Sequence, residues 1–261
     1  MLHFIVDKSK PGAKLRLFES DYHYLKHVLR IKKGNFLTVM NATGHKFSAE
    51  VTIISSGFIE ILVGNQLLPN NKKNYKFTLL QALPKGNLMD KIIRQSTELG
   101  IETIVPVISS RTQGKIKGDS LKKMIVRWNR ISREASQQSG SLPLRIASPL
   151  SLNTSLFDLK KTDLQLVFDI NGPILSKHLC ESKRFASITI AIGPEGGFTI
   201  RELEFLNENG FHTVSLGSFT LRVDTAVIAA ISAIEQVATA IDDWLTTPQI
   251  EKRIKNNNEK K

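Results

Sequence analysis

The chain has 261 residues, of which 41% are hydrophobic and 23% charged, a composition typical of a globular protein with a sizeable core. Its single cysteine, Cys180, excludes an internal disulfide, and we find neither an apolar stretch of membrane-spanning length nor a signal-peptide pattern, so we expect a cytoplasmic protein. The formal net charge of +12 favours an acidic partner, with nucleic acid as the first candidate.

The first 70 residues are predicted to be rich in β-structure. Short apolar runs alternate with turn residues such as Pro11-Gly12 and Lys33-Gly34. Short strands at close spacing are typical of a small barrel. We expect strands at residues 2–6, 13–18, 36–40, 45–54 and 59–63.

A helix interrupts these strands at residues 20–29 and brings His23, His27 and Arg30 near one another. The two histidines have the spacing of a metal pair, but no further ligands are apparent, and solvated or packed histidines explain them better. At the edge of a barrel, His27 and Arg30 are placed to contact phosphate.

A polar run at residues 69–74 marks a domain boundary. Beyond it, a strand at residues 77–83, a helix at 88–99 and a strand at 103–108 form a β-α-β unit. We therefore expect four segments: a barrel (1–70), a linker (71–74), a second domain (75–247) and a flexible basic tail (248–261).

The helix at residues 88–99 carries a polar stripe formed by Lys91, Arg94, Gln95 and Glu98. Solvent exposure is the usual explanation of such a stripe. The alternative is that it faces a cleft, because Lys85 lies just before it at the end of a strand.

Residues 109–145 form the most basic part of the chain, with nine lysines or arginines against Asp119 and Glu134. A concentrated basic segment is better evidence for phosphate contact than a diffuse excess. A helix over residues 119–138 is expected to pack an apolar face on the core and to direct cations outward, to solvent or to nucleic acid. The predicted nucleic-acid contacts in and around this segment are Arg111, Arg127, Arg130 and Gln138.

The most informative stretch is residues 188–236, in which two strands end in glycine turns. A buried strand at 188–192 runs into Gly193-Pro194-Glu195-Gly196-Gly197. A helix follows from about Thr199, whose hydroxyl can cap it in a capping box with Glu202 three residues on. A second strand at 212–216 leads to Gly217 and to a long apolar helix at 225–245. A preceding strand at 164–169 ends beside Asn171.

Strand-end turns of this kind gather at the carboxyl edge of an α/β sheet, where ligands bind. Two ordinary tight turns are the simpler explanation, but two in succession, with Arg222 and Asp224 beside the second, favour a site built from backbone. The sequence contains no nucleotide-binding fingerprint, no Ser-His-Asp order and no zinc spacing.

These residues also carry a resemblance. GPEGGFT at 193–199 and the later LG-x3-LR-x-(D/E)-TA pattern at 216–226 resemble the RsmE family, uridine-N3 methyltransferases of small-subunit ribosomal RNA in the SPOUT superfamily. The stretches HYLKHVLR, ALPKGNLMDKIIRQSTELGI and EASQQSG are similar to further family patterns.

The resemblance implies an α/β fold: a SPOUT-type knotted parallel sheet with helices on both faces, plus an N-terminal PUA-like β-barrel that binds RNA. It implies S-adenosylmethionine as cofactor with no metal, a homodimer with no membrane, and ribosomal RNA or the small ribosomal subunit as partner. Further RNA contacts are then His27, Arg30, Lys85 and Arg94. The predicted cofactor-binding residues are Gly193, Pro194, Gly196, Gly197, Leu216, Gly217, Leu221 and Asn171.

Methylation at uracil N3 requires that a proton be removed or that negative charge be stabilised. Arg222 is the predicted charge stabiliser, and Asp224, Glu195 and Glu98 are candidate bases or orienting groups. Asp224 with Thr225 would also serve as a simple helix cap.

The sequence departs from the family pattern LGxRILRTETA at three functional positions: Phe219 replaces an arginine, Val223 a threonine and Asp224 a glutamate. Two alternatives stay open. The protein could methylate another RNA nucleotide, or it could be a non-catalytic RNA-binding factor in ribosome assembly.

Overall fold

A computed structural model describes residues 3–6, 10–67, 73, 75–112, 119–152, 161–176 and 185–246. The chain divides into two compact units, the first formed by Met1–Lys72 with Asn129–Pro143 and the second by Lys73–Trp128 with Leu144–Lys261. Most of the predicted linker, the predicted basic tail and Cys180 lie outside the described residues. The domain boundaries drawn from the sequence stay a prediction.

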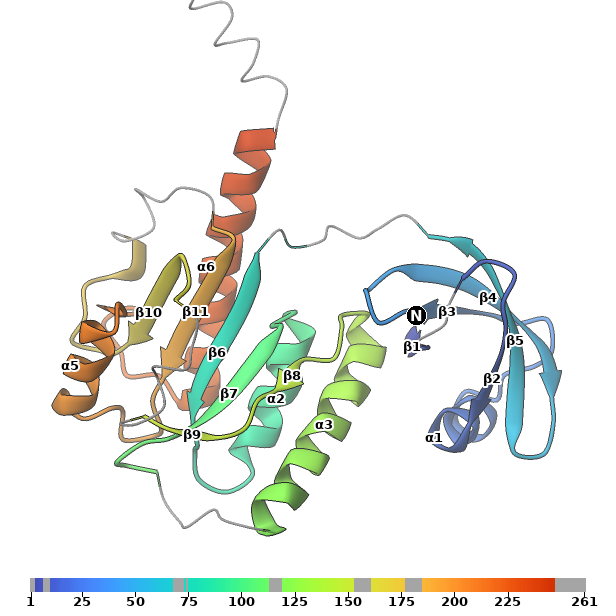
Figure 1. The fold of residues 1–261 in the computed structure, drawn as a ribbon, viewed down its shortest axis with the longest axis horizontal. Helices are drawn as coiled ribbons and strands as arrows, with labels where there is room; N and C mark the ends of the chain where they lie inside the picture. The colour runs from blue at the N-terminus through green and yellow to red at the C-terminus, as the bar shows by residue number, and fades with distance from the viewer. Residues whose placement is uncertain are drawn as a thin grey trace, which may run out of the picture. The chain divides into compact units, whose positions relative to one another are not determined.

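The first unit is built on a five-stranded sheet with the order β1-β3-β4-β5-β2. Only β1 and β3 pair in parallel; the other neighbours are antiparallel. The sheet curls into a half-barrel with β1 and β2 at its edges (Figure 1). Its strands match the predicted ones to within a few residues at each end: β1 (His3–Ile5), β2 (Lys14–Phe18), β3 (Phe36–Met40), β4 (Lys46–Ile54) and β5 (Phe58–Gln66).

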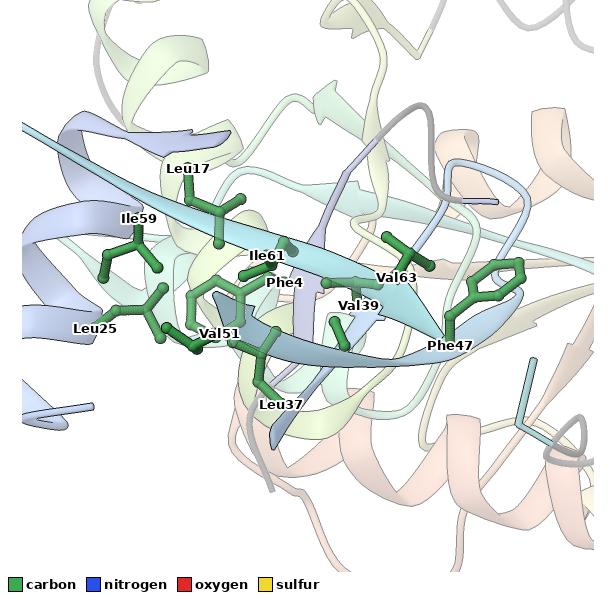
Figure 2. Packing of buried hydrophobic residues seen from close by; sticks show 11 residues of the cluster. Phe4, Leu17, Leu25, Leu37, Val39, Phe47, Val51, Ile59, Ile61 and Val63 are labelled. Atoms are coloured by element: carbon green, nitrogen blue, oxygen red, sulfur yellow. The ribbon is translucent and has the colours of Figure 1, made fainter. Parts of the chain in front are cut away.

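Alternate residues of these strands form the core of the first unit. Val39 on β3, Val51 on β4 and Ile61 on β5 are fully buried, because side chains at period two share the concave face of the sheet. Leu25 closes this core from the helical segment (Figure 2). The alternation therefore predicts the buried face as well as the strands.

The predicted helix at residues 20–29 forms in two parts, α1 (Glu19–His23) and a π-helical turn η1 (Tyr24–Val28). Leu29 N–H donates to the Tyr24 carbonyl, which is the i to i−5 pattern of a π-helix. Arg30 follows with a positive φ of 51° and turns the chain out of the helix.

The second unit is built on a parallel sheet with the order β12-β10-β11-β6-β7-β8, and β9 also pairs with β7. All pairings among the described strands of this sheet are parallel. Its strands are β6 (Lys76–Ala82), β7 (Thr103–Ile108), β8 (Arg145–Ile146), β9 (Leu150–Ser151), β10 (Leu164–Phe168), β11 (Ser187–Ile192) and β12 (His212–Val214).

Helices cover both faces of this sheet, as predicted (Figure 1). On one face, Leu206 of α5 (Ile200–Glu208) packs with Leu80 and Ala191 of the strands. On the other, α2 (Leu88–Glu98) packs on α6 (Val223–Thr246), and α6 contacts β11. The remaining helix, α3 (Asp119–Ser139), belongs to the second unit up to Trp128 and to the first from Asn129 onward.

The helix α6 corrects one expectation. Its window Val223–Ala240 has a mean hydropathy of 1.3 and is long and apolar enough to span a membrane by length and composition, so the statement that no such stretch exists was wrong. The two charges of the window, Asp224 and Glu235, are both paired with lysines. Part of the window, 39%, is buried in the fold, and a core helix of a globular protein meets the same test.

Candidate functional site

A cavity of about 410 Å³ lies at the carboxyl ends of three neighbouring strands, β10, β11 and β12. Its lining comes mainly from the loops that follow these strands, with further residues from the start of α5, the first turn of α6 and Arg111 after β7. Because all three strands are parallel, their following loops meet at one edge of the sheet. The edge where ligands were expected from the sequence is therefore hollow.

The loop after β11 presents main chain to this cavity. A Cβ on Gly193 would lie 3.0 Å from the Gly197 Cα and the Phe198 nitrogen, so only glycine lets the loop fold back this closely. The Gly197 N–H donates to the Pro194 carbonyl at 2.8 Å, and Gly197 has a φ of +69°. Since these positions carry no side chain, a ligand here meets backbone N–H and C=O groups.

Two neighbouring strand ends hold this loop in place. The Arg111 guanidinium, after β7, donates to the Gly196 carbonyl. The Lys85 N–H, after β6, donates to the Glu195 carboxylate at 2.9 Å. Arg111 was predicted to contact RNA; in the structure its guanidinium bonds to the cavity lining.

The start of α5 is fixed by the predicted capping box. Thr199 and Glu202 exchange bonds between side chain and backbone, and Glu202 also accepts the Ser110 N–H at 2.7 Å. Burial alone would raise the pKa of Glu202, but the hydrogen bonds from Thr199 and Ser110 outweigh it and lower the pKa. Glu202 is therefore an ionised carboxylate that ties the start of α5 to the loop after β7.

The loop after β10 adds polar groups that the sequence analysis did not name. Asp169 lines the cavity and accepts two hydrogen bonds from Asn171, through its backbone N–H at 2.9 Å and its side-chain amide at 3.1 Å. Asn171, predicted to bind cofactor, lines the cavity too. The available signal for Asp169 was its position directly after a buried strand.

The third loop, residues 215–222, leads into α6. Leu216 and Leu221 line the cavity as predicted, whereas Gly217, with a φ of +139°, turns the chain and does not line it. Phe219 lines the cavity mouth although 85% of its surface is exposed. Of the predicted cofactor-binding residues, seven of the eight therefore line one cavity; Gly217 is the exception.

The predicted catalytic residues separate into three situations. Glu195 lines the cavity. The Arg222 carbonyl accepts the first intrahelical hydrogen bond of α6, from the Ala226 N–H, which makes Arg222 the N-cap. The side chain of Arg222 is exposed and has no partner among the described residues. Glu98 is the last residue of α2, about 15 Å along the helix from its first residue, and it does not line the cavity.

Asp224 is buried in the first turn of α6, and Lys91 of α2 donates to it at 2.6 Å. The hydrogen bond from Lys91 lowers the pKa of Asp224, and burial opposes it. Asp224 is not the N-cap that the sequence suggested, since α6 begins one residue earlier, at Val223. An ionised carboxylate bound to a lysine acts as an anchor for the start of α6.

The predicted RNA-binding residues are divided between the two units. Arg127 is paired with Asp90 of α2, and Arg130 has a long pair with Glu134 at 3.6 Å. In the first unit, the ring of His27 contacts the ring of His23 in a tilted arrangement, with centroids 4.8 Å apart. Four further residues are exposed: Arg30, Lys85, Arg94 and Gln138.

Within the described residues, no group of three or more histidine, cysteine, aspartate or glutamate side chains could hold a metal ion. His23 and His27 have the spacing of a metal pair, but they gain no third ligand there. The cavity is thus lined by backbone, apolar side chains and single charged groups.

Two family models match the chain and together cover most of it. An RNA methyltransferase domain matches residues 71–235, and an RNA methyltransferase PUA domain matches residues 17–64. The two matches fall on the parallel sheet and on the curled sheet, respectively.

Individual relatives agree with these models. The chain is 34% identical to ribosomal RNA small subunit methyltransferase E of Synechocystis sp. over 85% of this chain and 73% of that protein. It is 32% identical to methyltransferase E 2 of Borreliella burgdorferi over 81% of this chain and 86% of the relative.

A solved structure of ribosomal RNA small subunit methyltransferase E from Neisseria gonorrhoeae, bound to S-adenosyl methionine, superposes with a TM-score of 0.82. Its sequence is 27% identical, and the match covers 91% of this chain and 98% of that one. The chain therefore belongs to the ribosomal RNA small subunit methyltransferase E family.

Proposed function

We propose that this protein transfers a methyl group from S-adenosylmethionine to N3 of a uridine in the RNA of the small ribosomal subunit. The observation that carries the proposal is the backbone-lined cavity at the carboxyl ends of β10, β11 and β12. It lies within the part of the chain that matches the RNA methyltransferase domain.

The residues around the cavity fit S-adenosylmethionine. Main-chain groups of Gly193, Gly196 and Leu216 can read the edge of an adenine, and apolar side chains such as Leu221 and Val223 can cover its faces. The carboxylate of Asp169 offers an acceptor for hydroxyl or ammonium groups. When bound, the cofactor supplies an electrophilic methyl on a sulfonium, so the protein has chiefly to align the acceptor.

The protein must also manage the proton on uracil N3. Arg222 follows the lining residue Leu221, and its side chain is free of partners among the described residues. It stabilises negative charge that develops on the uracil. Glu195 is the catalytic carboxylate of this account, because it lines the cavity and can accept the proton.

Asp224 takes a positioning role in this account. Its bond to Lys91 ties the first turn of α6 to α2, and Arg222 is the N-cap of that turn. Holding this turn fixed holds the backbone from which Arg222 projects. Asp224 is therefore expected to act through Arg222 rather than on the substrate.

The first unit and the exposed cations supply RNA affinity. His27 and Arg30 leave the π-helical turn at the surface of the first unit, and Lys85 and Arg94 are exposed on the second. Contacts from such groups to phosphate strengthen binding without selecting a sequence. Uridine selection then belongs to the cavity.

We also infer that two copies associate through α6. The helix is apolar over its 18-residue window, yet only 39% of that window is buried in one copy. A second copy would cover the remaining apolar surface, and Ala229 and Ala233 allow close helix packing. Light scattering after gel filtration should give twice the mass of the chain; a monomer would contradict this inference.

The protein is expected to act in the cytoplasm.

The reaction is tested on small-subunit RNA from a strain that lacks this gene. Purified protein and labelled S-adenosylmethionine are added, and the nucleosides are resolved by mass spectrometry. The wild-type protein should produce N3-methyluridine, and Arg222→Ala should reduce it at least about a hundredfold. Arg201→Ala, which removes an exposed arginine of α5 that does not itself line the cavity, is the matched control and should be unaffected.

Each other outcome has a distinct meaning. A methyl group on a different nucleotide would keep the methyltransferase and move the substrate. Binding of S-adenosylmethionine without any RNA methylation, or no binding at all, would contradict the proposed reaction and favour a non-catalytic RNA-binding factor.

A further inference from the structure

The rim of the cavity is apolar and exposed, whereas its floor is buried. Phe219 is 85% exposed and Ile200 is 75% exposed, although both line the cavity. Deeper in the lining, Phe198 and Val223 are only 5% and 6% exposed. The lining thus divides into an enclosed part and an open apolar edge.

Phe219 is the aromatic member of this edge. It lies in the loop between β12 and α6, three residues before Arg222, and is flanked by the exposed polar residues Ser218 and Thr220. Its ring makes no stacking contact with another ring among the described residues. A solvent-exposed phenyl ring beside a cavity contributes nothing to packing of the fold, but it offers a flat face to a planar ligand.

We propose that Phe219 stacks on the target base and holds it at the cavity mouth. This inference rests on the proposed function and deepens it, because it names the residue that receives the acceptor. A base that accepts a methyl group has to leave its stack in the RNA and cross the rim of the cavity. An aromatic side chain at that rim replaces part of the stacking that the base gives up.

The geometry favours the acceptor base over the adenine of the cofactor. A molecule held within the enclosed lining meets Gly193, Leu216 and Val223, which are buried or half-buried. Phe219 stays open to solvent outside that enclosure. A ring that enters from the solvent side can cover Phe219, and this is the route of the RNA.

Stacking by Phe219 gives affinity but no choice of base. A phenyl ring has no hydrogen-bonding group, and every base offers a π face. Removing the ring should therefore weaken all acceptors equally. Choice of uridine is left to groups that bond to the edge of the base, such as Arg222 and Glu195.

The test uses Phe219→Leu, which keeps an apolar side chain, and Phe219→Trp, which keeps an aromatic one. Because Phe219 is 85% exposed, neither change disturbs the core. With small-subunit RNA from the deletion strain, kcat/KM for RNA should fall about tenfold or more in Phe219→Leu and stay within about twofold in Phe219→Trp. The dissociation constant of S-adenosylmethionine, measured by calorimetry, should stay within about twofold in both.

Ile174→Ala is the matched control. Ile174 is an exposed apolar residue that does not line the cavity. Its backbone pairs with Ser215, which lies in the loop that contains Phe219. Its removal should change neither quantity, which separates a stacking ring from general apolar surface.

Three results would overturn the proposal. Wild-type kcat/KM in Phe219→Leu would mean that no base stacks there while the proposed function stands. An equal loss of cofactor affinity would place the ring on the adenine instead. A wild-type protein that transfers no methyl to RNA would remove the proposed function and, with it, the acceptor that Phe219 is said to hold.

Discussion

Two glycines, Gly57 in the first unit and Gly193 in the second, are needed for different reasons, and the difference distinguishes a simple turn from the candidate site. In the curled sheet, Gly57 turns the chain between β4 and β5 with a φ of +91°, and a Cβ there would meet nothing within 4 Å. In the parallel sheet, a Cβ on Gly193 would meet backbone at 3.0 Å. The first glycine serves a conformation and the second serves a close approach of two main chains.

The two sheets also differ in what their strands leave open. The antiparallel strands of the first unit bury one alternating face around Val39, Val51 and Ile61. The parallel strands of the second unit are buried on both faces, and their loops gather at one edge. Chemistry is consequently expected at the loops of the second sheet, and the first sheet is expected to add RNA affinity.

The largest effect should come from adding one methyl group to the cavity loop. Gly193→Ala forces the Gly197 backbone to shift by a few tenths of an ångström, so the affinity for S-adenosylmethionine should fall at least about a hundredfold. Gly57→Asn, in the first unit, should leave that affinity unchanged, because asparagine tolerates positive φ. Calorimetry on both variants measures this; equal effects would break the comparison between the sheets.

The next largest effect concerns Glu202, which ties the start of α5 to the loop after β7. Glu202→Gln removes the carboxylate that accepts the Ser110 and Thr199 N–H groups and should lower the free energy of unfolding by about 2 kcal/mol. Urea titrations at pH 7 measure it. A loss below about 0.5 kcal/mol would show that the second unit does not depend on this bond.

The same residue predicts a dependence on pH. Hydrogen bonds hold the pKa of Glu202 below its ordinary value of 4.5, so its contribution is complete above about pH 5 and is lost as the pH falls through the folded-state pKa. The stability gap between wild type and Glu202→Gln should therefore narrow on acidification. A gap that stays constant down to about pH 3 would contradict the assignment.

A smaller effect is expected at the pair that anchors α6. Lys91→Ala leaves the buried Asp224 carboxylate without its cation, and the free energy of unfolding should fall by about 1–2 kcal/mol, since Lys91 itself is half exposed. Lys122→Ala, which breaks an exposed pair with Asp119, should cost less than about 0.5 kcal/mol. Methylation should fall in the first variant alone, because Arg222 loses its support.

The smallest effect is expected in the first unit. Arg30→Asn removes a cation while keeping a residue that accepts the positive φ at this position. RNA affinity should fall about threefold at 0.1 M salt, with no change in cofactor affinity and a slope of log K against log salt that is shallower by about one. Lys14→Asn is the charge-matched control on β2. A loss of cofactor affinity in Arg30→Asn would contradict the assignment of RNA affinity to the first unit and of cofactor binding to the second.

Much of the fold follows from local patterns. Period-two alternation predicts the strands of the first sheet, and apolar runs that end in glycine predict β11 and its loop. The capping box of Thr199 and Glu202 is likewise a local signal that the structure confirms. These features could be predicted because their causes lie within a few residues of one another.

The contacts that were missed join residues far apart in the chain. Lys91 bonds to Asp224, 133 residues further along the chain, and the periodicity of neither helix predicts that pair. The grouping of Asn129–Pro143 with Met1–Lys72 likewise joins residues that are far apart in the chain. Glu98 was misplaced because helical spacing gives a face but not the distance from a strand end.

The backbone of the second unit is expected to hold the cofactor. Amide hydrogen exchange with and without S-adenosylmethionine tests this most directly, since it measures the protection of individual main-chain N–H groups. The account predicts added protection in the loops at 193–198 and 215–222, with unchanged exchange at residues 10–67. Protection confined to the curled sheet, or no protection in either loop under saturating cofactor, would contradict it.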